Sequence, residues 1–97
     1  MAFIQIIEYR TSDHESMRKA EEEWLAATEG KRTARRLITG QDRNDPSRFM
    51  EIVFFDSYES AMENSNLPET AAAAEQFMSL SDGAVFHDLE VIGDMEG

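Results

Sequence analysis

The chain has 97 residues, the size of one domain, with 20 acidic and 9 basic residues and a formal net charge of -11. This charge repels phosphate backbones and anionic lipid, so it argues against nucleic acid and membrane surfaces as partners. Because there is no cysteine, disulfides and thiolate sites are excluded, and we expect so small a domain to gain stability from oligomerisation or a bound ligand.

The N-terminal part predicts a strand followed by a helix. Residues 3–9 are rich in isoleucine and aromatic residues, as strands are. Ser12 and Glu15 have the spacing of a capping box, and apolar residues then recur at helical intervals until Gly30. Trp24 lies on this apolar stripe and is predicted to be a core anchor.

The middle of the chain predicts a hairpin. Residues 34–39 form a polar strand of the kind found at sheet edges, and residues 48–55 form the most apolar strand. The loop between them is rich in turn-forming residues, so the two strands should pair. Asp56 and Glu59 repeat the capping-box spacing and predict a short helix through Asn64.

The C-terminal part predicts a second helical segment and a last strand. Pro68 is suited to the first position of a helix, and residues 69–80 are rich in alanine. Residues 85–92 predict the final strand. The element order is therefore βαββαβ with an interrupted second helix, which predicts an α+β, ferredoxin-like single domain over residues 1–97, with a four-stranded antiparallel sheet and its helices on one face.

The strands are apolar on both sides, which one layer of helices cannot cover. On the first strand Ile4 and Ile6 occupy one side, and the other side carries Phe3, Gln5, Ile7 and Tyr9. An exposed apolar sheet face is an aggregation hazard, so we expect a second copy to cover it. The sequence thus predicts a homodimer through the sheet face.

The element order, the segment Ser-Asn-Leu-Pro-Glu at 65–69 and the segment Phe-His-Asp-Leu-Glu-Val at 86–91 resemble the dimeric α/β-barrel superfamily. In this family two ferredoxin-like sheets pack face to face. The resemblance is to an uncharacterised, actinobacterial-type member related to antibiotic-biosynthesis monooxygenases. It implies a homodimer and, if the protein is an enzyme, a cofactor-free oxidoreductase of the monooxygenase type. The haem-degrading branch is disfavoured, because no asparagine falls on the first strand and the sole tryptophan falls on the first helix.

Three polar residues interrupt the side of the sheet that we assign to the cleft between the two sheets: Gln5, Glu51 and Asp88. They either hydrogen-bond one another or the arginines Arg35 and Arg36, or they serve a ligand. In an apolar cleft the pKa of a buried carboxyl rises, and the group is suited to act as a general base toward an acidic phenol or enol. The predicted ligand-binding set consists of Gln5, Glu51, Asp88, Phe49, Phe86 and Tyr9.

The two histidines do not have metal-ligand spacing, so neither a metal nor a cofactor is expected. His14 should be exposed in the first turn of a helix, and His87 should point toward the helices. The acidic run at residues 21–23 is interpreted as a solvated helix face.

Two functions remain in competition. The first is a non-catalytic homodimer that binds a small apolar or aromatic molecule in a cleft between its sheets. The second is a cofactor-independent monooxygenase acting on a phenolic or polycyclic compound. A cytoplasmic location is expected, because the N-terminus lacks the features of a signal peptide.

Overall fold

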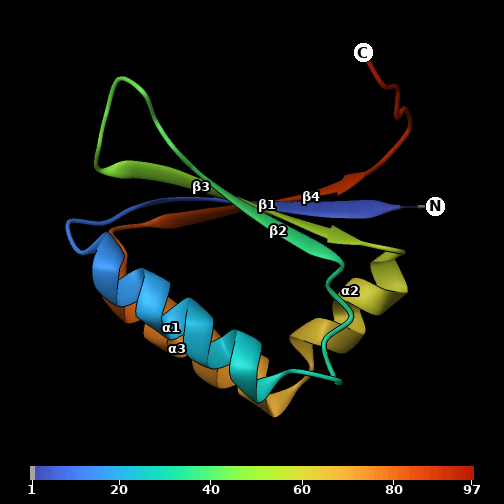
Figure 1. Ribbon diagram of the computed structural model, residues 1–97, viewed down its shortest axis with the longest axis horizontal. Coiled ribbons are helices and arrows are strands. Elements are labelled where there is room, and N and C mark those ends of the chain that lie inside the picture. Colours follow the sequence, from blue (N-terminus) through green and yellow to red (C-terminus); the bar gives the residue numbers. More distant parts are fainter. Residues whose placement is uncertain (1) are drawn as a thin grey trace.

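A four-stranded antiparallel sheet carries its helices on one face in the computed structural model, which describes residues 2–97 (Figure 1). The strand order is β2-β3-β1-β4, so the fold is the predicted ferredoxin-like arrangement with β1 and β3 in the centre. The elements are β1 (Phe3–Arg10), α1 (His14–Ala27), β2 (Arg36–Gln41), β3 (Arg48–Phe55), α2 (Tyr58–Ser65), α3 (Pro68–Leu80) and β4 (Ala84–Glu90).

Two helices begin at other caps than the sequence predicted. In α1 the cap is Asp13 and not Ser12, and its carboxylate accepts from the Ser16 backbone N–H at 3.1 Å. In α2 the capping box joins Ser57 and Ser60, and Asp56 instead forms an ion pair with Arg35 at 2.5 Å. In both helices the cap is the residue directly before the first helical residue, from which a side-chain oxygen can reach the free N–H groups of the first turn.

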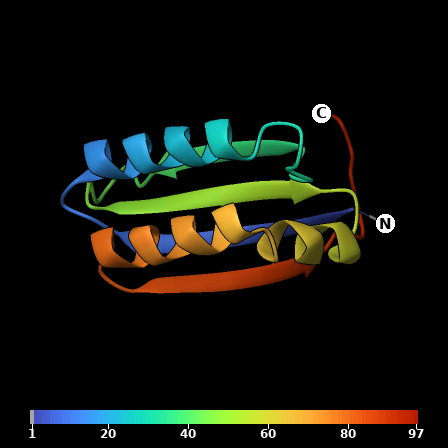
Figure 2. The same cartoon turned by 90° about the horizontal axis from the view of Figure 1, so that it is seen from below.

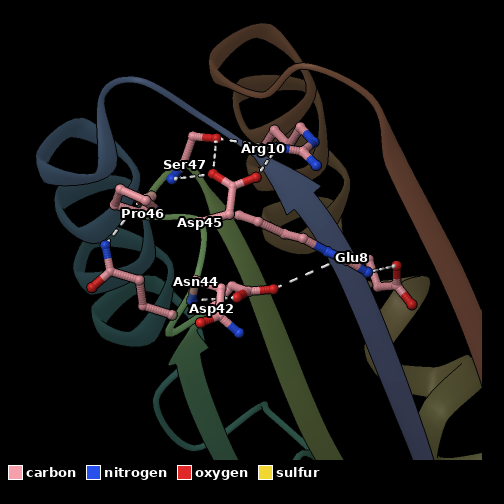
Figure 3. Close-up of polar contacts among 9 residues, drawn as sticks. Glu8, Arg10, Asp42, Asn44, Asp45, Pro46 and Ser47 are labelled. Atoms are coloured by element: carbon pink, nitrogen blue, oxygen red, sulfur yellow. Dashed lines mark hydrogen bonds and ion pairs between the residues drawn. The ribbon is translucent and has the colours of Figure 1, made fainter.

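The predicted hairpin is confirmed, although β2 begins two residues later than expected and β4 ends earlier. Its loop is fastened to the end of β1, where Arg10 contacts Asp45 and donates to Ser47 Oγ at 3.2 Å (Figure 3). The hydrogen bonds from Ser47 and the Arg10 guanidinium lower the pKa of Asp45 to about 2. These contacts fix the acidic loop against the sheet.

The buried core is divided into two clusters at opposite ends of the strands. One contains Phe3, Val53, Phe55 and Ala61, and the other contains Tyr9, Met17 and Phe49. Along β1 and β3, the residues between these clusters are Gln5, Ile7 and Glu51. The middle of the helix-covered face therefore lies between the two buried clusters and is not part of either.

The open face is the side of the sheet away from the helices. Its polar part is a cluster at one end, in which Glu8 contacts both Arg48 and His87 at 3.1 Å. Our prediction that His87 points toward the helices is therefore wrong. The rest of the open face is mainly apolar and is formed by Ile4, Ile6, Ile38, Met50, Ile52, Phe54, Val85 and Leu89, with the Arg36 guanidinium over the Phe54 ring.

The two sides of each strand alternate as predicted, but the helices cover the side that we had assigned to a second sheet. Phe3, Tyr9 and Phe49 are almost fully buried, at 2%, 3% and 4% exposure, and lie beneath the helices. The aromatic rings of Phe3, Tyr9, Phe49 and Phe55 pack between the sheet and the helices, whereas the open face is mostly aliphatic. Glu51 consequently lies under the helices and not in a cleft between two sheets.

Candidate functional site

A cavity of about 480 Å³ lies between the sheet and the helices α1 and α3. The two helices run side by side across the sheet, with α1 on the β2 side (Figure 2). Between them, Trp24 Nε1 of α1 donates to Thr70 Oγ1 of α3 at 3.0 Å. The volume lies within the range of small-molecule sites in proteins.

Most of the cavity wall is apolar or aromatic. The apolar side chains that line it are Ile7, Met17, Ala20, Trp24, Leu37, Val53, Phe55, Ala71, Ala73, Ala74, Phe77, Met78 and Phe86. The alanines of α3 lack bulk beyond Cβ, and this creates the space above the middle of the sheet. The alanine run that favours the helix thus also produces the cavity.

Glu51 is the most unusual polar group of the wall. It lies in the central strand β3 opposite Ile7 and Thr39, and its exposed fraction is only 9%. Burial raises the pKa of Glu51 to about 8, and the nearby charge and hydrogen bond of Glu21 act in the same direction. Among the described residues 2–97, no cation forms an ion pair with Glu51.

Glu21 is the partner that the sequence reasoning missed. We interpreted residues 21–23 as a solvated face, but Glu21 is half-buried, lines the cavity and hydrogen-bonds to Glu51. By contrast, Glu22 pairs with Arg18 at the surface. The helical spacing from Met17 to Glu21 to Trp24 carried the signal, because residues at these intervals share one face of a helix.

The predicted ligand-binding residues are only partly brought together. Gln5, Tyr9, Glu51 and Phe86 line the cavity. Asp88 accepts a hydrogen bond from Gln5 at 3.1 Å, which fits the alternative that these residues satisfy one another. Phe49 lies beneath Tyr9 and His14 and does not line the cavity. Whether any of them binds a ligand remains a prediction.

The arginines named as alternative partners of Glu51 are engaged elsewhere. Arg35 pairs with Asp56, and the Arg36 guanidinium lies 6.0 Å from the centre of the Phe54 ring. The Glu51 carboxyl group is therefore neutralised by its own proton, since a charged carboxylate at this depth without a cation would be costly.

Three further side chains of the cavity wall carry aromatic rings: His14, Trp24 and Tyr9. His14, expected in solvent, is half-buried and stacks on Phe49 with ring centres 4.3 Å apart. Trp24, expected as a core anchor, is only partly buried and forms part of the wall. Burial and the nearby Glu51 and Glu21 raise the pKa of Tyr9 above its usual range, so its hydroxyl group keeps its proton.

Within residues 2–97, no group of three or more His, Asp or Glu side chains is arranged to hold a metal ion. In the same part of the chain, none of the helices has both the length and the apolar character needed to cross a membrane.

Comparison with protein-family models and with curated proteins found no match. Solved structures do match over nearly the whole chain. SnoaB of Streptomyces nogalater, described as a cofactor-independent oxygenase, superposes with a TM-score of 0.85 at 8% identity, covering 99% of this chain and 98% of SnoaB. The fold is shared.

Two further neighbours agree with this. A protein of Chloroflexus aurantiacus, provisionally named an antibiotic biosynthesis monooxygenase, gives a TM-score of 0.77 at 17% identity and covers 99% and 98% of the two chains. Rv0793 of Mycobacterium tuberculosis gives 0.80 at 10% identity and covers 99% and 100%. The structural neighbours thus include ferredoxin-fold proteins of the antibiotic-biosynthesis monooxygenase type. At such identities the likeness defines the fold and leaves the activity open.

Proposed function

We propose that this protein binds a small aromatic molecule with a weakly acidic hydroxyl group in the cavity between its helices and its sheet. The observation that carries the proposal is Glu51, a carboxyl group with a raised pKa of about 8 and no cationic partner among residues 2–97, set in an aromatic cavity. A group of this kind costs stability in the empty protein, so a role toward a ligand accounts for it better than a structural role.

The carboxyl pair of Glu51 and Glu21 suits a hydroxyl ligand. At neutral pH Glu51 holds its proton and is engaged with Glu21, while lone pairs on the two groups remain able to accept a hydrogen bond. A phenol or enol can donate to the pair, and its rings can contact Phe77, Phe86 and Trp24. Above pH 8 the ionised Glu51 becomes a base within reach of the same hydroxyl group.

A second candidate function is cofactor-independent oxygenation, favoured by the buried base and by the likeness to SnoaB. In this reaction Glu51 would remove a proton from an activated methylene carbon, and the resulting carbanion would pass electrons to O₂. The oxygen adduct then loses water to give a ketone. The reaction balances as R₂CH₂ + O₂ giving R₂C=O + H₂O, so O₂ is the oxidant and the only co-reactant.

Binding is tested by calorimetric titration with 2-naphthol as the probe. We expect a dissociation constant of roughly 0.1–1 mM, as the number of its atoms allows. Ala73→Phe, which fills the cavity, should abolish binding. Ala72→Phe is the matched control, because Ala72 is exposed and outside the wall. Absence of binding to the wild type, or equal loss in both variants, would overturn the proposal.

Oxygenation is separated from binding by supplying anthrone, whose methylene carbon is acidified by two rings and a carbonyl group. An oxygen electrode should record one O₂ consumed per ketone formed, with the rate rising as pH approaches 8. If O₂ uptake equals the protein-free rate while 2-naphthol still binds, the oxygenase function is wrong and the binding function stands.

For the open face we propose a second copy of the chain as the partner, with the two sheets packed together. This is supported by the exposure of Ile38, Met50, Val85 and Leu89, which is between 36% and 54% in the single chain. A contiguous apolar sheet face of this kind is typical of an interaction surface.

A further inference from the structure

A second hollow adjoins the ligand cavity on the far side of Trp24. It has a volume of about 280 Å³ and lies between the C-terminal part of α1 and the start of β2. Glu21, Trp24 and Leu37 line both spaces. A molecule in the main cavity therefore needs to pass only one side-chain wall to place a substituent in this hollow, which we call the arginine hollow.

The arginine hollow is where the positive charge of an acidic protein gathers. The chain has only 9 basic residues, and four of them fall between residues 31 and 36. Three of these, Arg32, Arg35 and Arg36, border the hollow, and the guanidinium of Arg36 lies over Phe54 of the open face. Because the net charge of -11 over the whole chain repels anions, this is the part of the ligand site at which an anionic group would be tolerated.

Arg32 is the residue best placed to bind such a group. Its Nη1 donates to the Leu25 carbonyl at 2.9 Å and to Thr28 Oγ1 at 3.0 Å, and its guanidinium lies 5.5 Å from the centre of the Trp24 ring. These contacts hold one end of the planar group in place. Its Nε and Nη2 donors have no acceptor among residues 2–97, so a guanidinium that is held at Nη1 and has further donors free lines the arginine hollow.

We propose that the arginine hollow binds the carboxylate of a ligand whose rings occupy the main cavity, so that the ligand class is an aromatic carboxylic acid with a hydroxyl group. The inference rests on the proposed function. A planar guanidinium matches a carboxylate in shape and donates two parallel hydrogen bonds to it. Because Asp56 neutralises Arg35 and Glu21 lies on the shared wall, the local balance suits one negative charge better than the two of a phosphate.

The test compares 6-hydroxy-2-naphthoate with its methyl ester, which has the same rings and hydroxyl group but no charge. By calorimetry at low salt we expect the acid to bind about tenfold more tightly than the ester, as a hydrogen-bonded charge typically contributes. Arg32→Gln should remove this preference and change binding of the ester less than twofold. Arg43→Gln is the control, since Arg43 is exposed in the β2–β3 loop.

A salt titration of the wild type makes the test independent of how the variant folds. Raising the salt from about 20 to about 500 mM should weaken binding of the acid severalfold and leave the ester unchanged. Equal binding of acid and ester, or a preference that Arg32→Gln retains, overturns the arginine hollow while the proposed function stands. Failure of both probes to bind overturns the proposed function itself.

Discussion

The two faces of the sheet are both largely apolar, yet they differ in where their ionisable side chains lie and in whether these side chains are paired. On the helix-covered face a carboxyl pair lies in the interior, where Glu51 is almost fully buried and carries a raised pKa of about 8. On the open face Glu8 forms an ion pair with Arg48 and also contacts His87, near the end of the strands. A compensated cluster at the margin suits an interface between proteins, whereas an uncompensated acid in a cavity suits a ligand.

This difference explains why one small sheet has two apolar sides. The helices close the first side only at its ends, through the clusters around Phe3 and Tyr9, and leave the cavity between them. Nothing in residues 2–97 closes the second side. A substitution on the open face should therefore weaken the dimer and leave the cavity intact. A substitution in the cavity should leave the dimer intact.

The largest effect is expected from Ile52→Glu. Ile52 pairs with Ile6 and Ile38 in the middle of the open face. In a symmetric dimer the change buries two unpaired carboxylates, so we expect a loss of ~6 kcal/mol or more, about 10⁴-fold in the dissociation constant. Sedimentation equilibrium at micromolar concentration should give a dimer for the wild type and a monomer for the variant.

The matched control is Ala26→Glu, which places the same charge on an exposed position of α1. It should remain dimeric. A monomeric wild type, or a dimer that survives Ile52→Glu, would show that the open face is not the interface.

The second effect concerns Glu51→Gln and pH. Because the pKa of Glu51 rises from 4.5 to about 8 on folding, the folded state holds a proton that the unfolded state has lost between these values. The free energy of unfolding should therefore fall as pH rises from 4.5 to 8 and be level above that. Relative to Glu51→Gln, the wild type should lose roughly 5 kcal/mol across this window.

Urea unfolding of both proteins at several pH values measures this difference, and the subtraction removes the titration of groups common to both. A constant difference from pH 4.5 to 9 would mean that Glu51 is solvated or paired with a cation.

The smallest effect is expected from Thr70→Val, which removes the hydrogen bond from Trp24 Nε1 between the two helices above the cavity. The change should lower the free energy of unfolding by about 0.5–1.5 kcal/mol without altering the dimer. Thr70→Ser keeps the hydroxyl group and should behave as the wild type. A loss in Thr70→Ser with no loss in Thr70→Val would contradict this and point to the methyl group, and hence to packing, as the contribution of Thr70.

The sequence predicted the element order, the hairpin and the side of each strand on which Gln5, Glu51 and Asp88 lie together, because strand alternation depends only on local spacing. It placed the helices on the wrong side of the sheet. The alternation of side chains along a strand assigns each residue to one of two sides. Because both sides are apolar here, it does not show on which side the helices pack. That choice is made by tertiary packing of the bulkier aromatic side.

The carboxyl pair was missed for a related reason. Glu21 stands in a run of three glutamates, and such a run ordinarily marks a solvated helix face. Only its helical spacing from Met17 and Trp24 distinguishes it from Glu22 and Glu23. The arginine hollow depends on a contact between α1 and the segment before β2, which no local pattern encodes.

The ligand is proposed to bind beneath the helices and not on the open face, and intermolecular NOEs test this most directly. The protein would be labelled with ¹³C in its methyl groups and saturated with 2-naphthol. We predict NOEs from the ring protons of the ligand to the methyl groups of Met17, Ala20 and Ala74, which line the cavity. NOEs to Ile6, Met50 and Ile52 instead would place the ligand on the open face and contradict the account.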